Sequence, residues 1–295
     1  MRLKFLLTGP KKIGSLSHDL LRAIEARGHN GYISNTRDFI FEIENNKLKA
    51  SAAGISDLFD FDIYLFRSFS MTMANSRIFI EELRKRKKIV IEKNISDYYI
   101  NSKLAEGVRL IRKGLYYPRT YQISDRKNKI ILPKNIFPAI VKPADGARGR
   151  DIKLIKNKPE LYNFLNKHTE DFLIQEYLEI KWDVRVFVVG NKVLGGIKRH
   201  VLEGDCRSNA SLGSAVECYK ITPETKKIAL AATKALGYAV AGVDLAWVEN
   251  KKSWYVLEVN ISPQWHAFKR ITGINPADSI IDYAIKKHFE LKNKS

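Results

Sequence analysis

Two apolar stretches near the C-terminus, residues 240–248 and 254–261, have the length of adjacent β-strands, yet each carries a carboxylate in its middle. A side-chain period of two leaves Glu258 and Asn260 together on one face of the second stretch. Its other face is apolar and consists of Tyr255, Leu257, Val259 and Ile261. Two oxygen ligands at positions i and i+2 of a rigid strand suit a hard cation. The pattern therefore predicts a sheet with one apolar face and one cation-binding face.

The short connection between these stretches predicts an antiparallel hairpin. If Glu249 pairs with Ser253, a three-residue loop places Asp244 directly opposite Glu258. Facing carboxylates repel each other unless a cation lies between them. Two carboxylates and an amide oxygen are the ligands that Mg²⁺ prefers when nucleotide phosphates complete its octahedron. The alternative is that both acids pair with Arg or Lys on a half-exposed sheet. The pattern favours a metal site formed by Asp244, Glu258 and Asn260.

A second motif lies at residues 138–152, where two short apolar strands flank a loop that contains two glycines. Gly146 and Gly149 would allow backbone N–H groups to approach an anion, and Lys142 and Arg148 supply positive charge. The alternative is a solvated hairpin. Because a lone lysine at the end of an apolar strand needs an anionic neighbour if it is buried, the motif favours a phosphate-binding loop.

Strong alternation predicts a third motif, a hairpin over residues 181–200 with a two-residue turn. Such a turn places Asp183 opposite Lys198 and Arg185 opposite Gly196. These charges could form a cross-strand ion pair, which contributes little if it is exposed. Beside a phosphate site, Arg185 and Lys198 would instead be binding groups.

The order of strands and helices predicts three regions. Residues 1–93 alternate strand, helix and strand, as a small parallel α/β domain does. A helical run then stops at Gly114, and the glycine loop belongs to a smaller region over residues 94–178. The strongly alternating remainder, residues 179–295, contains the predicted metal site.

Charge and composition limit the partners. The 51 Lys and Arg against 32 Asp and Glu give a formal charge of +19, which predicts an anionic partner. The densest basic run, residues 84–88, precedes an apolar strand and is interpreted as a solvated helix end, so nucleic acid is not expected. Two cysteines are too few for a zinc site, and no apolar run approaches the ~18 residues of a membrane span. We therefore expect a cytoplasmic protein that does not bind a membrane, and a homo-oligomer is left open.

Several short motifs occur in one order along the chain, and together they are more specific than any one of them alone. They are residues 140–143 with the glycine loop, 174–178, 183–185, 205–209, 242–244 and 257–263. With these motifs the chain resembles the ATP-grasp superfamily, and it is similar in particular to the RimK-like carboxylate–amine ligases of the alpha-L-glutamate type.

The resemblance implies an α/β and α+β architecture: an ATP-grasp fold of two α+β halves that hold ATP between them, behind an N-terminal Rossmann-like (pre-ATP-grasp) domain. The three regions would be this domain, a central ATP-grasp subdomain and a C-terminal one with the Mg²⁺ site. It implies the following binding roles: phosphate contacts for Lys103 and Lys142; an adenine hinge of Gln175, Glu176, Tyr177 and Leu178; a ribose contact for Asp183; phosphate and substrate contacts for Arg207, Ser208 and Asn209; and Mg²⁺ ligation by Asp244, Glu258 and Asn260. It implies catalytic roles for Arg185, Lys198, Arg199 and Asn209.

The implied reaction joins a carboxylate to an amine. A substrate carboxylate attacks the γ-phosphate of ATP, held with two Mg²⁺ ions or with Mn²⁺ as an alternative, and an amine then displaces phosphate from the acyl phosphate to form an amide. The amino acid would be glutamate or another amino acid, an acidic one being favoured. It would be joined to an amine or a carboxylate on a small molecule, a peptide or a protein tail. Two alternatives stay open, an ATP-grasp kinase of a small hydroxyl compound and an ATP-binding regulatory protein without turnover.

Two features bear on the acceptor. Residues 263–266, Pro-Gln-Trp-His, replace the glycine-bearing turn that is common after Ser-Pro in the superfamily, near the expected acceptor site. A basic approach surface would also increase the encounter rate with an acidic acceptor. The residues expected around its mouth are Lys198, Arg199, His200, Arg207, Lys269 and Arg270. We therefore expect an anionic acceptor or product.

Overall fold

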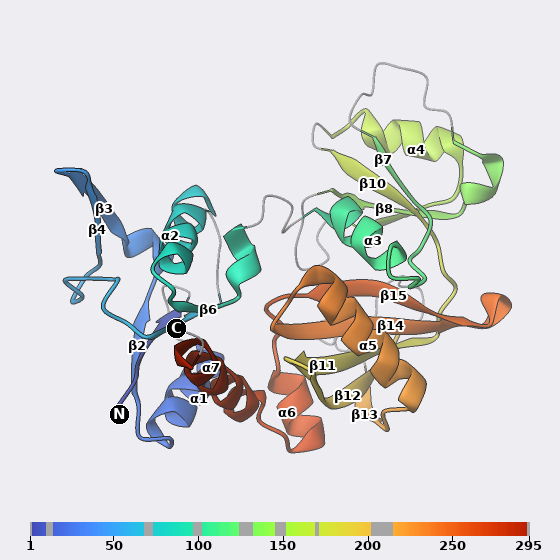
Figure 1. The fold of residues 1–295 in the computed structure, drawn as a ribbon. Coiled ribbons are helices and arrows are strands. Elements are labelled where there is room, and N and C mark those ends of the chain that lie inside the picture. The colour runs from blue at the N-terminus through green and yellow to red at the C-terminus, as the bar shows by residue number, and fades with distance from the viewer. Residues whose placement is uncertain are drawn as a thin grey trace.

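The computed structural model describes residues 2–9, 14–67, 73–96, 102–123, 132–144, 152–168, 171–201 and 215–293. Within these residues the chain forms two four-stranded sheets, one five-stranded sheet and a two-stranded hairpin. Figure 1 shows the first sheet and its helices on one side of the molecule, and the other two sheets one above the other on the opposite side.

The first sheet is parallel, in the order β2-β1-β5-β6. Its strands are β1 (Lys4–Thr8), β2 (Asn30–Ser34), β5 (Ile63–Phe66) and β6 (Ile89–Ile91), and its helices are α1 (Ser15–Glu25) and α2 (Met73–Lys85). All four residues of β5 are buried, as expected of a parallel strand that is covered on both faces. The expected parallel α/β unit is therefore present.

One hairpin of this region was not expected from the sequence. It consists of β3 (Ile40–Glu44) and β4 (Lys47–Ser51), and its two strands are antiparallel. Lys49 pairs across the strands with Glu42 and Glu44, and most side chains of the hairpin are exposed. Charged and apolar residues nevertheless alternate along both strands, and Phe41, Leu48 and Ala50 pack on the core of the first sheet. This period-two pattern on either side of residues 45–46 is the signal that could have found the hairpin.

The second sheet is antiparallel, in the order β7-β10-β8-β9. Its elements are β7 (Thr120–Ile123), β8 (Ala139–Pro143), β9 (Lys153–Ile155), β10 (Phe172–Glu176) and α4 (Lys158–Leu165), and α3 (Lys103–Ile111) precedes it. Ser102 caps α3, since its side chain accepts the N–H of Ala105. This cap places Lys103 at the first position of the helix.

The third sheet is antiparallel, in the order β13-β12-β11-β14-β15. Its strands are β11 (Trp182–Val189), β12 (Lys192–His200), β13 (Val216–Tyr219), β14 (Val240–Val248) and β15 (Ser253–Asn260), and the remaining helices are α5 (Pro223–Leu236), α6 (His266–Thr272) and α7 (Pro276–Lys292). Thr222 and Thr225 form a capping box at the start of α5, and Gly237 ends it with a φ of 70°. The apolar side of α5 packs against β11 and β14.

Irregularities in two hairpins change the predicted pairing. Between β11 and β12 the register shifts by one residue, so Asp183 lies opposite Arg199 rather than Lys198, and Arg185 opposite Ile197 rather than Gly196. The prediction for these pairs was wrong because β12 contains one extra residue, Leu194, which alternation cannot reveal.

In the hairpin of β14 and β15, Ser253 pairs with Val248 rather than with Glu249, but a second irregularity beside Asp244 restores the expected pairing of Asp244 with Glu258. The extra residue of β15 is Leu257. As a result, the core that contains Val259 includes Trp254 and Val256 instead of Tyr255 and Leu257. Tyr255 and Leu257 pack instead in a small cluster with Leu178.

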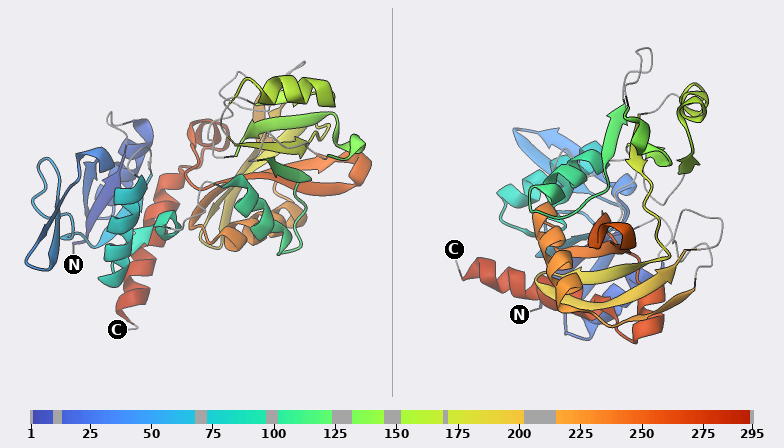
Figure 2. Two further views of the ribbon diagram at one scale, coloured as in Figure 1. Left: turned by 90° about the horizontal axis from the view of Figure 1, so that it is seen from above. Right: turned by 90° about the vertical axis from the view of Figure 1, so that its right-hand side faces the viewer.

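The last helix returns to the first sheet. Helix α7 contacts α1, β5 and β6, and one continuous core contains Leu3, Leu65, Trp265 and Ile281. In both views of Figure 2, α7, in red, lies beside the blue strands of this sheet. The three-region division stays a prediction, and α7 makes these contacts across the first and third predicted regions. Within the described ranges, no helix is both long and apolar enough to cross a membrane.

Candidate active site

The predicted metal ligands lie together on the face of the third sheet that points away from α5. Asp244 and Glu258 are opposite each other in register, and the Nδ2 of Asn260 donates to Oδ2 of Asp244 at 3.4 Å. The neighbouring residues Val243 and Leu245 pack in the core beneath α5, so alternation directs Asp244 to the opposite face. Two carboxylates and one amide are thus gathered in one patch.

Two guanidinium groups hold the Asp244 carboxylate. Arg185 donates to both of its oxygens, from Nε and Nη2, each at 2.7 Å, and Nη2 of Arg199 lies 3.1 Å from Oδ2. Burial alone would raise the pKa of Asp244, but the charges of Arg185 and Arg199 hold that pKa below its ordinary value. Asp244 is therefore a buried, ionised carboxylate whose charge is balanced from within the sheet.

Asp183 extends this network across the sheet. Arg199 donates to its two oxygens at 2.6 and 2.7 Å, and both side chains are buried. The bidentate pair follows from the shifted register, which sets Asp183 beside Arg199. The side chain expected to contact ribose is therefore occupied by an arginine here, and Asp183, Arg199, Asp244 and Arg185 form one chain of alternating charges.

The other carboxylate pairs with the start of α3. Nζ of Lys103 lies 2.7 Å from Oε1 of Glu258. Burial opposes both charges, but each group stabilises the other, so the pKa of Lys103 is raised and the pKa of Glu258 is lowered. The structure therefore brings a predicted phosphate-binding lysine to a predicted metal ligand from the other half of the molecule.

Glu106 is a member of this cluster that sequence reasoning missed. It follows Lys103 by one helical turn, and one of its carboxylate oxygens accepts the N–H of Val259 at 3.3 Å. Burial, followed by the charge of Glu258, raises the pKa of Glu106 to about 8. Its spacing from Lys103 on one face of a predicted helix is the signal that could have found it.

Lys142 reaches the same cluster from the second sheet. Its Nζ donates to the side-chain oxygen of Gln175 at 2.9 Å, and Nε2 of Gln175 donates to Thr120 at 2.8 Å. Burial and then the charge of Lys103 lower the pKa of Lys142 to about 8, opposed by Glu258 and Glu106. Lys142 is thus a partly buried cation between the second and third sheets, at the end of an apolar strand.

The predicted hinge, residues 175–178, runs from the end of β10 towards the third sheet. Glu176 accepts the N–H of Arg119 at 2.9 Å and pairs with Lys251 at 2.7 Å. The N–H of Tyr177 donates to Pro138, and Leu178 packs in the cluster with Tyr255. The side chain of Glu176 therefore ties the two sheets together beside the cluster.

Other predicted site residues are not brought to this patch. Lys198 lies opposite Val184, whose side chain is in the core under α5, and its ammonium pairs with Glu217 at 2.9 Å. Cross-strand neighbours share a face, so Lys198 and Arg185 lie on opposite faces of the sheet. Arg207, Ser208 and Asn209, like Gly146, Arg148 and Gly149, lie outside the described residues.

The expected basic mouth is largely made of paired charges. The pairs are Lys198 and His200 with Glu217, Arg199 with Asp183, and Lys269 with Asp19. Arg270 lies on α6, and Arg207 is outside the described residues. The register and the acids of neighbouring elements, which the linear sequence does not connect, account for this neutralisation.

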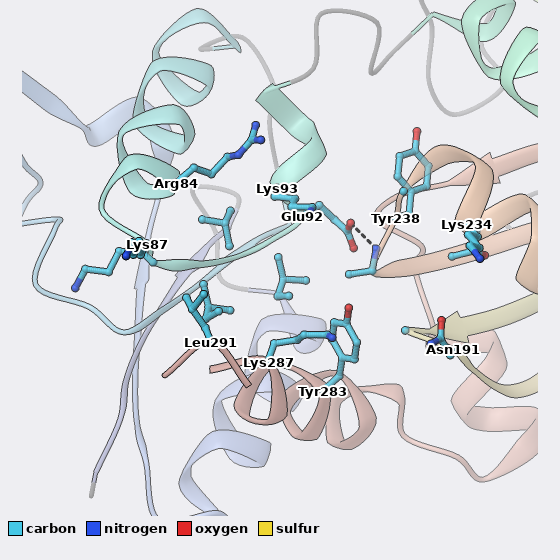
Figure 3. A pocket seen from close by; sticks show the side chains of 18 of the residues that line it. Arg84, Lys87, Glu92, Lys93, Asn191, Lys234, Tyr238, Tyr283, Lys287 and Leu291 are labelled. Atoms are coloured by element: carbon cyan, nitrogen blue, oxygen red, sulfur yellow. Dashed lines mark hydrogen bonds between the residues drawn. The ribbon is translucent and has the colours of Figure 1, made fainter. Parts of the chain in front are cut away.

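A separate pocket of about 580 Å³ lies between β6 of the first sheet, the last turns of α5 with residues 237–239, and α7. Figure 3 shows Glu92 between these elements, with its hydrogen bond to the backbone drawn as a dashed line. The carboxylate accepts the N–H groups of Ala239 and Val240, and Asn94 donates to the last carbonyls of α5 and its cap. We call these contacts of Glu92 and Asn94 the junction clasp. Its residues join the first sheet to the third and are distinct from the charged cluster.

Two features together define a class of protein, the ATP-grasp enzymes. Lysines of α3 and β8 meet carboxylates of the third sheet, and a parallel α/β unit lies beside them. The profile of the "RimK-like ATP-grasp domain" matches residues 102–284, which is more than half of the chain. The chain belongs to this RimK-like ATP-grasp family and is an ATP-dependent ligase, as its motifs predicted.

Individual relatives agree with this assignment. The chain is 30% identical over 275 residues to a "Probable alpha-L-glutamate ligase 1" of Shewanella sp. (strain MR-4), covering 90% of each protein. Its fold is similar to that of the ATP-grasp ligase PsnB complexed with a phosphomimetic variant of minimal precursor, Mg and ADP (TM-score 0.72, 17% identity, 97% of this chain and 98% of the other). It is also similar to the D-alanine–D-alanine ligase of Bacillus anthracis complexed with ATP (TM-score 0.66, 16% identity, 99% and 100%). These likenesses confirm the expected ATP-grasp fold.

Proposed function

We propose that this ligase uses ATP and Mg²⁺ to join an amino acid, glutamate being the leading candidate, to a carboxylate on a small molecule, peptide or protein tail. The observation that carries the proposal is the meeting of Lys103 and Lys142 with Asp244 and Glu258 between the second and third sheets. The name of the Shewanella relative supports glutamate, and a further structure of PsnB, complexed with the precursor peptide PsnA2 and AMPPNP, supports a peptide or protein acceptor.

The donor set fits a hard divalent cation. Glu258 and Asp244 are both ionised and in register, and the amide of Asn260 lies beside them. These three residues would hold Mg²⁺, which when bound would neutralise charge that develops on the transferred phosphoryl group. Among the described residues no three His, Cys, Asp or Glu side chains form a metal cluster, so phosphate oxygens would complete the coordination.

The cations of the chain provide orientation and charge balance. Lys142 and Lys103 would bind the phosphates, and Lys103 would exchange part of its contact with Glu258 for them. Both oxygens of Asp244 accept from Arg185, so Arg185, like Lys103, would exchange part of its contact when Mg²⁺ binds to the carboxylate. The substrate carboxylate is itself the nucleophile, so the reaction requires no Ser or Cys nucleophile. Lys198 is left out of this machinery because it lies on the opposite face of the sheet.

Product analysis tests the proposal. The full chain is incubated with ATP, Mg²⁺, L-glutamate and a panel of carboxylate acceptors, including peptides with acidic tails. An acyl-phosphate route releases ADP and phosphate and adds the mass of one glutamate, less water, per turn. A phosphorylated product would instead indicate a kinase, and bound but unspent ATP a regulatory protein; either result would overturn the proposal.

A further inference from the structure

The first sheet has a topological switch point between β1 and β5. From β1 the chain moves to β2 on one side, and β5 and β6 follow on the other side. In open α/β sheets, ligands bind outside the carboxyl ends of the strands at this point. Arg67 directly follows β5, and its backbone N–H donates to the carbonyl and side-chain oxygens of Thr8 at the end of β1, each at 3.3 Å. Arg67 therefore stands at the switch point.

The guanidinium of Arg67 has little to balance its charge. Its Nη2 donates to the carbonyl of Pro263 at 2.8 Å, and its Cζ lies 4.8 Å from the centre of the Trp265 ring. Among the described residues no carboxylate forms an ion pair with it. Burial lowers the pKa of Arg67 to about 10, against a partial opposing effect of the Glu92 charge. A cation withdrawn from water without a partner is destabilising unless an anion binds to it.

This cation lies at the end of the strand that carries the proposed metal ligands. Ser262 follows Asn260 by two residues, and its hydroxyl donates to the carbonyl of Arg67 at 2.9 Å. Figure 1 shows how the chain passes from β15 to α6 and then to α7 beside the first sheet. Arg67 and the charged cluster are thus connected by one short segment.

Trp265 is one of the residues that stand in place of the glycine-bearing turn. Its ring is fully buried, its indole N–H donates to Asp19 at 3.1 Å, and Asp19 is fixed in turn by Lys269 at 2.8 Å. The ring is therefore a rigid support beneath the guanidinium, and a cation held over an aromatic face keeps its planar donors available to a ligand.

We propose that Arg67 forms a carboxylate-binding subsite, which holds a carboxylate of the amino-acid substrate that takes no part in the bond-forming step. The inference rests on the proposed function. A dicarboxylic amino acid that reacts through its amine keeps both carboxylates, and the planar fork of arginine binds one of them through two parallel hydrogen bonds. Arg67 is thus a specificity-determining residue for an anionic amino acid.

Substrate analogues with Arg67→Gln and Arg67→Lys test the subsite. L-Glutamate is compared with its α-amide and with L-glutamine, each of which lacks one carboxylate, and ADP release gives KM and kcat. Wild type discriminates at least tenfold against one of the two amides. In Arg67→Gln the KM for glutamate rises at least tenfold, this discrimination disappears and the KM for ATP changes less than twofold. Arg67→Lys keeps the charge without the fork and recovers part of the affinity.

Arg86→Gln is the matched control, because Arg86 also lies over an aromatic ring, that of Phe59 at 3.8 Å. The KM values of Arg86→Gln for glutamate, its α-amide and glutamine should equal those of wild type. The subsite would be rejected if Arg67→Gln still discriminated between glutamate and the amide as wild type does. It would also be rejected if the KM for glutamate and the KM for ATP rose equally. If wild type forms no amide from glutamate, the proposed function fails, and calorimetric titration with glutamate then tests the subsite alone: binding lost in Arg67→Gln supports it, and equal binding overturns it.

Discussion

Lys103 separates the behaviour of two partly buried carboxylates that lie close to each other. Glu258 contacts its ammonium directly, and the pKa of Glu258 falls despite burial. Glu106 makes no ion pair with it and also feels the charge of Glu258, so burial raises the pKa of Glu106 to about 8. Environments that push the pKa values of paired acids apart are characteristic of functional sites. One carboxylate is thus kept charged and the other largely neutral at pH 7.

Glu258→Gln is expected to lower turnover at least a hundredfold while the protein stays folded. The substitution removes the charge that would bind Mg²⁺, but its ion pair is partly exposed and contributes modestly to stability. ADP release at saturating Mg²⁺ and a thermal melt measure the two effects. Glu217→Gln, on the other face of the sheet, serves as the control. Turnover equal to that of wild type would remove Glu258 from the metal site.

Glu106→Gln is expected to make stability less dependent on pH. The pKa of Glu106 is raised from 4.5 to about 8 on folding, so the folded state holds this proton more tightly than the unfolded state. Its contribution to the stability of the folded state is therefore fully present below pH 4.5 and is lost as pH rises towards 8. Relative to wild type, the variant should therefore gain unfolding free energy between pH 5.5 and 8.5, on the order of 1–3 kcal/mol. Urea unfolding at several pH values measures this gain, and parallel pH profiles would contradict it.

Lys142→Ala is expected to weaken ATP binding by about 1.5–3 kcal/mol, the value of a charge-assisted hydrogen bond. Because the pKa of Lys142 is lowered to about 8, its ammonium loses its proton as pH rises through 8, and wild-type affinity for ATP should fall over that range. The variant should lack this fall. Titration calorimetry at pH 7 and pH 9 measures both, with Lys158→Ala on α4 as an exposed control. Unchanged affinity in Lys142→Ala would exclude it from the phosphate site.

At the scale of elements, two single-residue irregularities determine which side chains form the site. Leu257 restores the pairing of Asp244 with Glu258, and Leu194 gives Asp183 an arginine partner. A bulge turns every later side chain of its strand to the other face, so its effect on a site is much larger than its effect on the sheet.

Deletion of Leu257 tests this role. The hairpin should keep its pairing near Ser253, while Glu258 and Asn260 exchange faces with the apolar residues beside them. We expect near-complete loss of Mg²⁺-dependent ATP turnover together with retained β-sheet circular dichroism. Leu257→Ala, which keeps the bulge, should retain most activity. If the deletion variant were as active as Leu257→Ala, the bulge would not be what positions the ligands.

The sequence reveals the parts of this site that depend on alternation and motif order. The positions of three site residues could be predicted because each lies on a strongly apolar strand; they are Lys142, Asp244 and Glu258. The parallel first sheet could also be predicted, from its alternation of strands and helices. Alternation does not reveal a bulge. The cross-strand partner of Asp183 and the face of the sheet on which Lys198 lies therefore could not be predicted. Glu106 and Arg67 were missed because their importance comes from elements far away in the chain, β15 and the segment that follows it.

At the scale of the whole molecule, the first and third sheets are joined by the junction clasp of Glu92 and Asn94 and by the contacts of Arg67. The lysines proposed to bind phosphate, in contrast, lie between the second and third sheets. Recognition of the amino acid and of the nucleotide should therefore depend on different interfaces.

Glu92→Ala should consequently raise the KM for glutamate several-fold while the Kd for ATP stays within twofold of wild type. It should also lower stability, because loss of an acceptor for a buried N–H costs about 1–3 kcal/mol. Steady-state kinetics and calorimetry measure the two constants, and Glu82→Ala, whose carboxylate pairs with Lys85 on the surface of α2, is the control. An equal loss of affinity for ATP would show that the interfaces are not independent.

The return of α7 to the first sheet also constrains how the protein is made. The strands of that sheet are translated before the third sheet and before α7, the helix that covers them. Until α7 is synthesised, the apolar side chains that it covers lack their packing partner; Leu65 is one of them. A nascent chain that has not yet reached α7 therefore keeps an exposed apolar surface beside its N-terminal sheet, which is the kind of surface that chaperones bind.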